Sequence, residues 1–226
     1  MVITPILLSL KTASVAIVFT FVIGTLLAYA VCRSRNENAK AVADAILTLP
    51  LVLPPTVAGF FLLYIFGVNR PLGALLGEIG VKLVFSWPAT VLAAVVIALP
   101  LMYRSARAAF DQVDPMYLEA ARTIGLSETK IAYKILFPLA APGLTSGGIL
   151  SFSRGLGEFG ATAMIAGNIA GVSRTMPMAI YSAVVGGRPN EAYGYVIILV
   201  VLSFLFVLAI SVFVERKSGK YRLKTR

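Results

Sequence analysis

The sequence contains no histidine and a single cysteine, Cys32. A lone cysteine cannot form an internal disulfide, and the Cys/His clusters that hold zinc and related metals are excluded. No paired carboxylates and no nucleophile beside a base stand out along the chain. We therefore expect no metal site and no catalytic residues.

Charge is also scarce. Charged residues make up 13% of the 226 residues, against about 25% in soluble domains. Hydrophobic residues make up 58%, and the mean hydropathy is +0.88. Such a chain cannot cover a water-facing surface with polar side chains, so its class is integral membrane protein. The net charge of +10 then suggests a charge difference across the bilayer before it suggests nucleic-acid binding.

Long runs without any charge are plentiful. A transmembrane helix needs about 20 mostly apolar residues. We predict an all-α bundle of five transmembrane helices in one domain, residues 1–226, with spans at about 10–32, 45–68, 83–104, 135–156 and 192–214. A sixth charge-free run, 159–173, is short and rich in glycine, so we expect a broken or re-entrant segment after the fourth span.

The basic residues are distributed unevenly between the predicted loops. Most of the 20 Lys and Arg residues follow the first, third and fifth spans, which places them on one side of the bundle. The positive-inside rule assigns that side to the cytoplasm, with the N-terminus outside and the C-terminus inside. We expect a multi-pass protein of the cytoplasmic membrane, whose basic tail contacts lipid and binds no nucleic acid.

The second predicted span contains Pro50, Pro54 and Pro55. Each proline removes a backbone donor and disturbs a helix. A membrane tolerates this where neighbouring helices or a water-filled cavity satisfy the freed carbonyls. Two interpretations stay open: a kink that serves packing, or a bend that lines a translocation path, with Pro54 as its candidate residue.

The loop between the third and fourth spans is polar but has the composition of a helix. Asp114 is a helix N-cap followed by Pro115 at the first helical position, and Gly125 is a left-handed C-terminal cap. These signals predict a short helix at about 115–125. Ser127 is expected to cap a second helix that runs into the fourth span.

The short helix carries small and apolar residues on one face. That face consists of Tyr117, Ala120, Ala121 and Ile124. It packs either on the ends of the chain's own helices or in the groove of a partner protein. The local pattern favours neither interpretation.

A longer motif that begins in this short helix resembles the signature of a known family. Glu119-Ala120-Ala121 is followed after three residues by Gly125, and after nine more by Ile135 and then Phe137-Pro138. This resembles the E-A-A-x3-G-x9-I-x-L-P signature of type I ABC importer permeases, with Phe137 in place of leucine. The segments "LLSLKTASVA", "LPLVLPPTVAGFFLL", "LSFSRGLGEFGATAMIAGN" and "SRTMPMAIYS" look like those of molybdate permease subunits, so the resemblance covers nearly the whole chain.

The resemblance implies a permease for molybdate or tungstate, with a sulfate-type permease as the alternative. It implies a homodimer that assembles with two cytoplasmic ATP-binding subunits and an external oxyanion-binding protein. The short helix would then couple ATP hydrolysis to transport. The implied coupling residues are Tyr117, Glu119, Ala120, Ala121, Ile124, Gly125 and Leu126.

The chain has no G-x-x-x-x-G-K-[ST] loop of its own. We therefore expect it not to be an enzyme and to bind no cofactor, with ATP and magnesium used by the partner subunits. An ion-coupled secondary transporter or channel is the alternative from another class. Such proteins normally show inverted repeats or several buried acidic residues, and here Glu158 is a lone candidate.

Arg154 and Glu158 lie one helical turn apart at the end of the fourth predicted span. Ionisable residues at membrane depth usually face the bundle interior or a cavity. The two side chains either form a neutral pair that locks the fourth span to a neighbour, or Arg154 lends positive potential to an anion path. In the second case Glu158 moderates that potential, because conduction requires weak binding.

Overall fold

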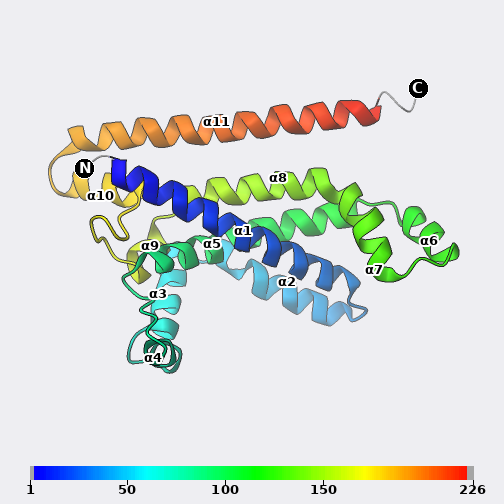
Figure 1. Cartoon of the computed structure of the whole chain (residues 1–226), viewed down its shortest axis with the longest axis horizontal. Coiled ribbons are helices and arrows are strands. Elements are labelled where there is room, and N and C mark those ends of the chain that lie inside the picture. The colour runs from blue at the N-terminus through cyan, green and yellow to red at the C-terminus, as the bar shows by residue number, and fades with distance from the viewer. Residues whose placement is uncertain (1–2, 223–226) are drawn as a thin grey trace.

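The computed structural model describes residues 3–222, and for residues 209–211 and 213–222 it describes the backbone only. Every regular element in this part of the chain is helical (Figure 1). The elements are α1 (Ile3–Arg33), α2 (Glu37–Val52), α3 (Pro55–Phe66), α4 (Pro71–Glu78), α5 (Trp87–Asp111), α6 (Pro115–Thr123), α7 (Glu128–Ile131), a π-helical turn η1 (Ala132–Leu136), α8 (Phe137–Leu156), α9 (Gly160–Ile165), α10 (Met176–Val185) and α11 (Pro189–Arg222).

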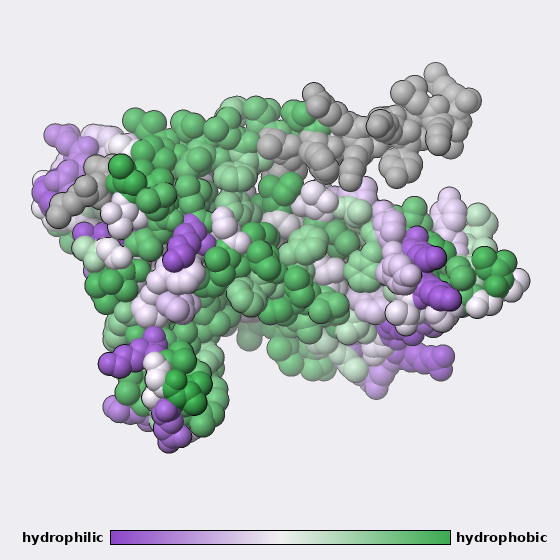
Figure 2. All heavy atoms as spheres, viewed as in Figure 1, coloured by the Kyte–Doolittle hydropathy of each residue, from purple (hydrophilic) through white to green (hydrophobic). Residues whose placement is uncertain are grey.

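Four helices are long and apolar enough to cross a membrane. They are α1, α5, the continuous helix Glu128–Leu156 and the segment Pro189–Leu208 of α11. The bent pair of α2 and α3 makes a fifth if it counts as one span. Apolar residues cover the middle of the molecule and polar residues gather at its two ends, as expected of a bundle that crosses a bilayer (Figure 2). The predicted all-α membrane fold is confirmed.

The range predicted as one span, 45–68, is two helices in the structure. α2 ends at Val52, α3 begins at Pro55, and the two helices meet at 110°. Pro54 and Pro55 have no N–H to continue the ladder of α2, and Pro55 suits the first position of a new helix. α3 and α4 therefore project sideways from the bundle (Figure 1). The prolines predict the place of the disturbance, and the structure adds its size, a 110° bend between two helices.

The segment after the fourth span is also broken, as predicted. α9 has 6 residues and is followed by a loop that reaches α10 at Met176. Its backbone turns at two glycines with positive φ, Gly167 (+67°) and Gly171 (+79°). α9 packs against α3 and α5, so protein rather than lipid surrounds its backbone.

The bundle is built on close contact between α1, α5 and α8. The contact face of α1 consists of small residues, among them Ala13, Ala16 and Ala28, which are at most 2% exposed. A Cβ added at Gly24 would lie 2.8 Å from Cγ of Met102 on α5. Small residues at these positions let the helices approach closely, which is how helices associate where water supplies no driving force.

The loops lie at two opposite ends of the bundle (Figure 1). One end, here called the hairpin end, carries α6, α7 and the connection from α1 to α2. The opposite end carries the start of α1, α4, α10 and the turn into α11. There Lys11 Nζ lies 3.9 Å from the ring centre of Trp87, an arrangement typical of a membrane interface. The basic tail from Arg216 onward lies outside the described side chains.

Candidate coupling hairpin and translocation path

α6 begins and ends as its capping residues dictate. The Asp114 side chain accepts a hydrogen bond from the Met116 amide at 2.8 Å, which satisfies one free donor of the first turn. At the other end Gly125 has a φ of +81°. The Leu126 amide donates to the Ala121 carbonyl at 3.1 Å across that turn, as in a Schellman motif. α6, Pro115–Thr123, therefore lies within the range 115–125 that the sequence predicts.

The second helix of the hairpin begins after Ser127, as predicted, but without the expected side-chain capping bond. Glu128 instead accepts hydrogen bonds from Arg122 Nε at 2.8 Å and Arg122 Nη2 at 3.4 Å, and its Oε2 lies 3.6 Å from Arg33 Nη1. The bond to Glu128 raises the pKa of the Arg122 guanidinium above its ordinary value. Neither partner of Glu128 was expected from the sequence.

The structure divides the apolar face of α6 between the chain and the solvent. Ala121 is 3% exposed, and Leu118 packs beside the core cluster at the hairpin end. Tyr117 and Ile124 point outward and are 52% and 75% exposed. Glu119 and Ala120 are exposed as well, and Leu126 is half-buried. Burial of Ala121 fits packing on the chain's own helices, whereas the exposed residues stay available to a partner protein, and docking there remains a prediction.

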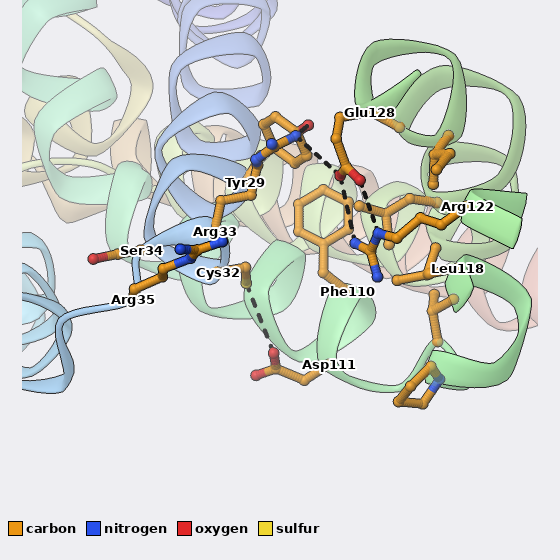
Figure 3. A pocket seen from close by; sticks show the side chains of 15 residues that line it. Tyr29, Cys32, Arg33, Ser34, Arg35, Phe110, Asp111, Leu118, Arg122 and Glu128 are labelled. Carbon is orange, nitrogen blue, oxygen red and sulfur yellow. Dashed lines mark hydrogen bonds and ion pairs between the residues drawn. The ribbon is translucent and has the colours of Figure 1, made fainter. Parts of the chain in front are cut away.

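A cavity of about 760 Å³ separates the hairpin from the ends of α1 and α5. Its wall combines aromatic rings with charged groups, and Figure 3 shows Glu128 between Arg33 and Arg122 at its rim. Cys32 lies in the same wall, where its Sγ donates to Asp111 Oδ1 at 3.7 Å. In the described part of the chain, no group of three or more His, Cys, Asp or Glu side chains could hold a metal ion.

Arg154 and Glu158 form an ion pair at the end of α8. Arg154 Nη1 lies 2.8 Å from Glu158 Oε2, and Glu158 Oε1 accepts a hydrogen bond from the Ala161 amide at 2.8 Å. Glu158 is 3% exposed, whereas the Arg154 side chain is 31% exposed. The carboxylate is thus fastened to α8 and to the first turn of α9, and the guanidinium still reaches the surface of this chain.

The helix break at Pro54 lies beside the same segment. A Cβ added at Gly160 would lie 3.0 Å from Cβ of Pro55, and one at Gly59 would lie 2.6 Å from Cα of Ala161. The beginnings of α3 and α9 therefore meet without room for side chains, and Pro54 itself is exposed. The tertiary structure brings Pro54, which is about a hundred residues away in sequence, to the same region of the bundle as Arg154 and Glu158.

A polar cluster between α2 and α5 was not foreseen from the sequence. Tyr103 donates a hydrogen bond to Asp44, Arg107 pairs with Asp44, and Arg107 Nε lies 3.8 Å from Asp111 Oδ2. No residue of α2 is buried, so this cluster is the main polar attachment of α2 to the bundle. The i,i+4 spacing of Arg107 and Asp111 is visible in the sequence, but Asp44 is not near them in the chain.

Comparison with known proteins decides the family. The family model described as "Binding-protein-dependent transport system inner membrane component" matches residues 3–219. The chain belongs to this family. It is thus a multi-pass protein of the cell membrane and a component of a transport system.

Curated relatives of this inner membrane component carry names from molybdenum transport. The molybdenum transport system permease protein ModB of Escherichia coli K12 is 40% identical over 205 residues, which cover 90% of this chain and 89% of the relative. The protein of the same name from Haemophilus influenzae is 34% identical over 221 residues, covering 97% and 96%.

Solved structures of ABC transporters share the fold of this inner membrane component. An inward-facing structure of the MetNI methionine ABC transporter matches with a TM-score of 0.75 at 20% identity, over 95% of this chain and 94% of that one. A bacterial alginate importer matches with a TM-score of 0.77 at 16% identity, over 95% and 79%. Identity this low supports the shared helical architecture and leaves the substrate to other evidence.

Proposed function

We propose that this chain is the permease subunit of an ATP-driven importer for molybdate or the closely similar tungstate. The observation that carries the proposal is the outward face of α6. A capped helix at the end of a membrane bundle exposes Tyr117 and Ile124 to solvent, which suits an apolar helix that docks in a partner's groove. The names of relatives about 40% identical over nine tenths of the chain support the choice of oxyanion.

The partner that we propose for α6 is an ATP-binding subunit. The sequence has no phosphate-binding loop of the G-x-x-x-x-G-K-[ST] type, so the energy for transport comes from elsewhere. We propose two such subunits, which bind the ATP and magnesium, a second copy of this chain and an external oxyanion-binding protein. Ala121 holds α6 to its own bundle, whereas Tyr117, Glu119, Ala120 and Ile124 meet the ATPase.

The translocation path of this proposal passes the beginning of α9. Arg154 supplies positive potential there, and Glu158 reduces it by pairing with the guanidinium. An unpaired cation in low dielectric would hold a dianion too tightly for release. The broken helix at Pro54 borders the same region, where close packing of α9 shelters its irregular backbone from lipid.

The proposed orientation puts the hairpin end in the cytoplasm. Residues 68–70 and 186–190 lie at the opposite end of the bundle (Figure 1). Reporter domains fused after Val68 and after Asn190 should therefore report an external location. A cytoplasmic signal from either fusion would contradict the orientation.

Uptake of labelled molybdate tests the function directly. In cells that lack their own molybdate permease, this chain with its ATPase and binding protein should restore uptake, and unlabelled molybdate or tungstate should compete. Competition by sulfate alone would replace the proposal with a sulfate permease. Uptake that continues without the ATPase would favour an ion-coupled transporter.

Two variants test the coupling hairpin. Glu119→Lys and Gly125→Pro should abolish ATPase association and uptake while the chain still inserts, because one reverses a charge on the docking face and the other breaks the positive-φ turn. Glu78→Lys and Gly80→Pro are matched controls at the opposite end, where Gly80 also has a positive φ (+76°) and no atom within 4 Å of an added Cβ. Normal ATPase pull-down and uptake in both hairpin variants would refute the coupling role.

A further inference from the structure

Glu128 occupies a branch point between three elements. It is the first residue of α7, and its carboxylate contacts Arg122 at the end of α6 through both oxygens. The same carboxylate pairs with Arg33, the last residue of α1, at 3.6 Å. Among the described residues, no other hydrogen bond or ion pair joins α1 to the α6–α7 hairpin. The Glu128 side chain therefore makes the polar link between α1 and the α6–α7 hairpin.

The ion pair of Glu128 with Arg33 spans a cavity rather than a packed interface. The cavity of about 760 Å³ lies between the hairpin and the ends of α1 and α5 (Figure 3). Leu118 makes apolar contact between the hairpin and the core cluster of the bundle, and Ala121 and Ile131 are buried. A hairpin beside a cavity can shift without first expelling packed side chains.

Arg33 is itself bonded to an aromatic cluster. Its Nη1 donates to the Tyr29 hydroxyl at 2.8 Å. The Tyr29 ring packs against Phe110 of α5 and Phe137 of α8, with ring centres 6.2 Å and 5.6 Å apart. A displacement that reaches Arg33 is therefore passed to an aromatic cluster that joins α1, α5 and α8.

The backbone that connects the hairpin to α8 contains an irregular turn. Between α7 and α8 the backbone forms the π-helical turn Ala132–Leu136. Such turns have wider hydrogen-bonded rings and recur at points where helices bend. Bending at this turn can take up part of a displacement of α6. The ion pair of Glu128 with Arg33 connects the hairpin to α1 without passing through the turn.

We propose that Glu128 is a positioning residue for energy coupling, acting as a latch between the hairpin and α1. Its pair with Arg122 keeps the turn between α6 and α7 from opening, and its pair with Arg33 passes the displacement of α6 to α1. The proposal deepens the proposed function and rests on α6 being the docking helix. Networked ion pairs at exposed sites change an equilibrium by up to about fivefold, so losing the latch weakens coupling and leaves assembly intact.

Reconstituted complexes test the latch with uptake per ATP hydrolysed as the readout. Glu128→Gln and Arg33→Gln should each lower this ratio about two- to fivefold. The double variant should be no worse than the more impaired single variant, because the two changes remove the same interaction. Glu37→Gln is the matched control, since Glu37 pairs with Lys40 within α2 at 2.7 Å. Unchanged ratios in the single variants, or losses that multiply in the double variant, would overturn the latch.

A second measurement separates the latch from the proposed function. Spin labels at residues 34 and 129, in a Cys32→Ala background of the full chain, report the spacing between α1 and α7. The distance distribution should be narrow in the parent and broader in Glu128→Gln. A wild-type complex that imports neither molybdate nor tungstate would contradict the proposed function, whereas equal distributions would contradict the latch.

Discussion

The pair of Arg154 and Glu158 gives the sharpest prediction, because its two ends differ in burial. Arg154→Gln leaves a carboxylate that is 3% exposed and still accepts a hydrogen bond from the Ala161 amide, but has lost its countercharge. Removing one partner of a buried ion pair costs about 3–5 kcal/mol, and we take about 3 kcal/mol because solvent reaches the Arg154 end. That corresponds to a fall of roughly 6–12 °C in Tm for a chain of this size.

The double variant Arg154→Gln/Glu158→Gln should recover most of that loss. It removes both charges, and the two new side-chain amides can hydrogen-bond to each other while the amide oxygen at position 158 still accepts from the Ala161 amide. We expect a residual cost of about 1 kcal/mol, the net value of an ordinary hydrogen bond. The stability of Glu158→Gln alone should lie between those of Arg154→Gln and the double variant. The remaining Arg154 guanidinium can turn toward the surface, because its side chain is already 31% exposed.

Heating the purified complex in nanodiscs and measuring the fraction still assembled gives Tm, and molybdate uptake is measured on the same variants. The rescued double variant should assemble but transport poorly if Arg154 provides potential along the path. A double variant as unstable as Arg154→Gln would refute the electrostatic reasoning. Wild-type uptake by a stable double variant would show that the pair is structural and that the path lies elsewhere.

Three further substitutions test individual contacts. Gly59→Ala should destabilise the chain by about 1–3 kcal/mol in a thermal assay and lower uptake, because the new Cβ meets backbone 2.6 Å away; Gly77→Ala, with open space around it, should not. Tyr103→Phe should speed trypsin cleavage in α2 by removing a hydrogen bond to a charged group, worth about 1.5–3 kcal/mol, while Tyr133→Phe, an exposed position, leaves the rate unchanged. Ile124→Asp should abolish ATPase pull-down with a normal Tm, since this side chain is 75% exposed, and retained binding would contradict docking through this face.

The local signals of the hairpin were readable from the sequence because they are chemical and short-range. Asp114, Pro115 and Gly125 act on their own turn of backbone, and each stands in the structure as its type requires. The Ser127 side chain was the exception. It makes no capping bond, and the neighbouring Glu128 side chain bonds instead to Arg122 across the turn, a partner that capping rules do not consider.

The size of the bend at Pro54 could not be predicted in the same way. A proline pair removes backbone donors wherever it stands, and the resulting angle is set by what the next helix can pack against. Here α3 lies on α9, which approaches closely because Gly59 and Gly160 have no side chains. The 110° turn is therefore decided by a segment about a hundred residues further along the chain.

By itself the sequence determined that this protein is a helical membrane bundle, where its loops fall and where a short helix interrupts them, because apolar length and capping chemistry act locally. Tertiary structure alone decided which side of that helix faces the chain and which faces outward. It also decided that Glu128 reaches Arg33 and that the path candidates share one region. Those outcomes depend on distances between helices, and packing sets such distances only after the helices have formed.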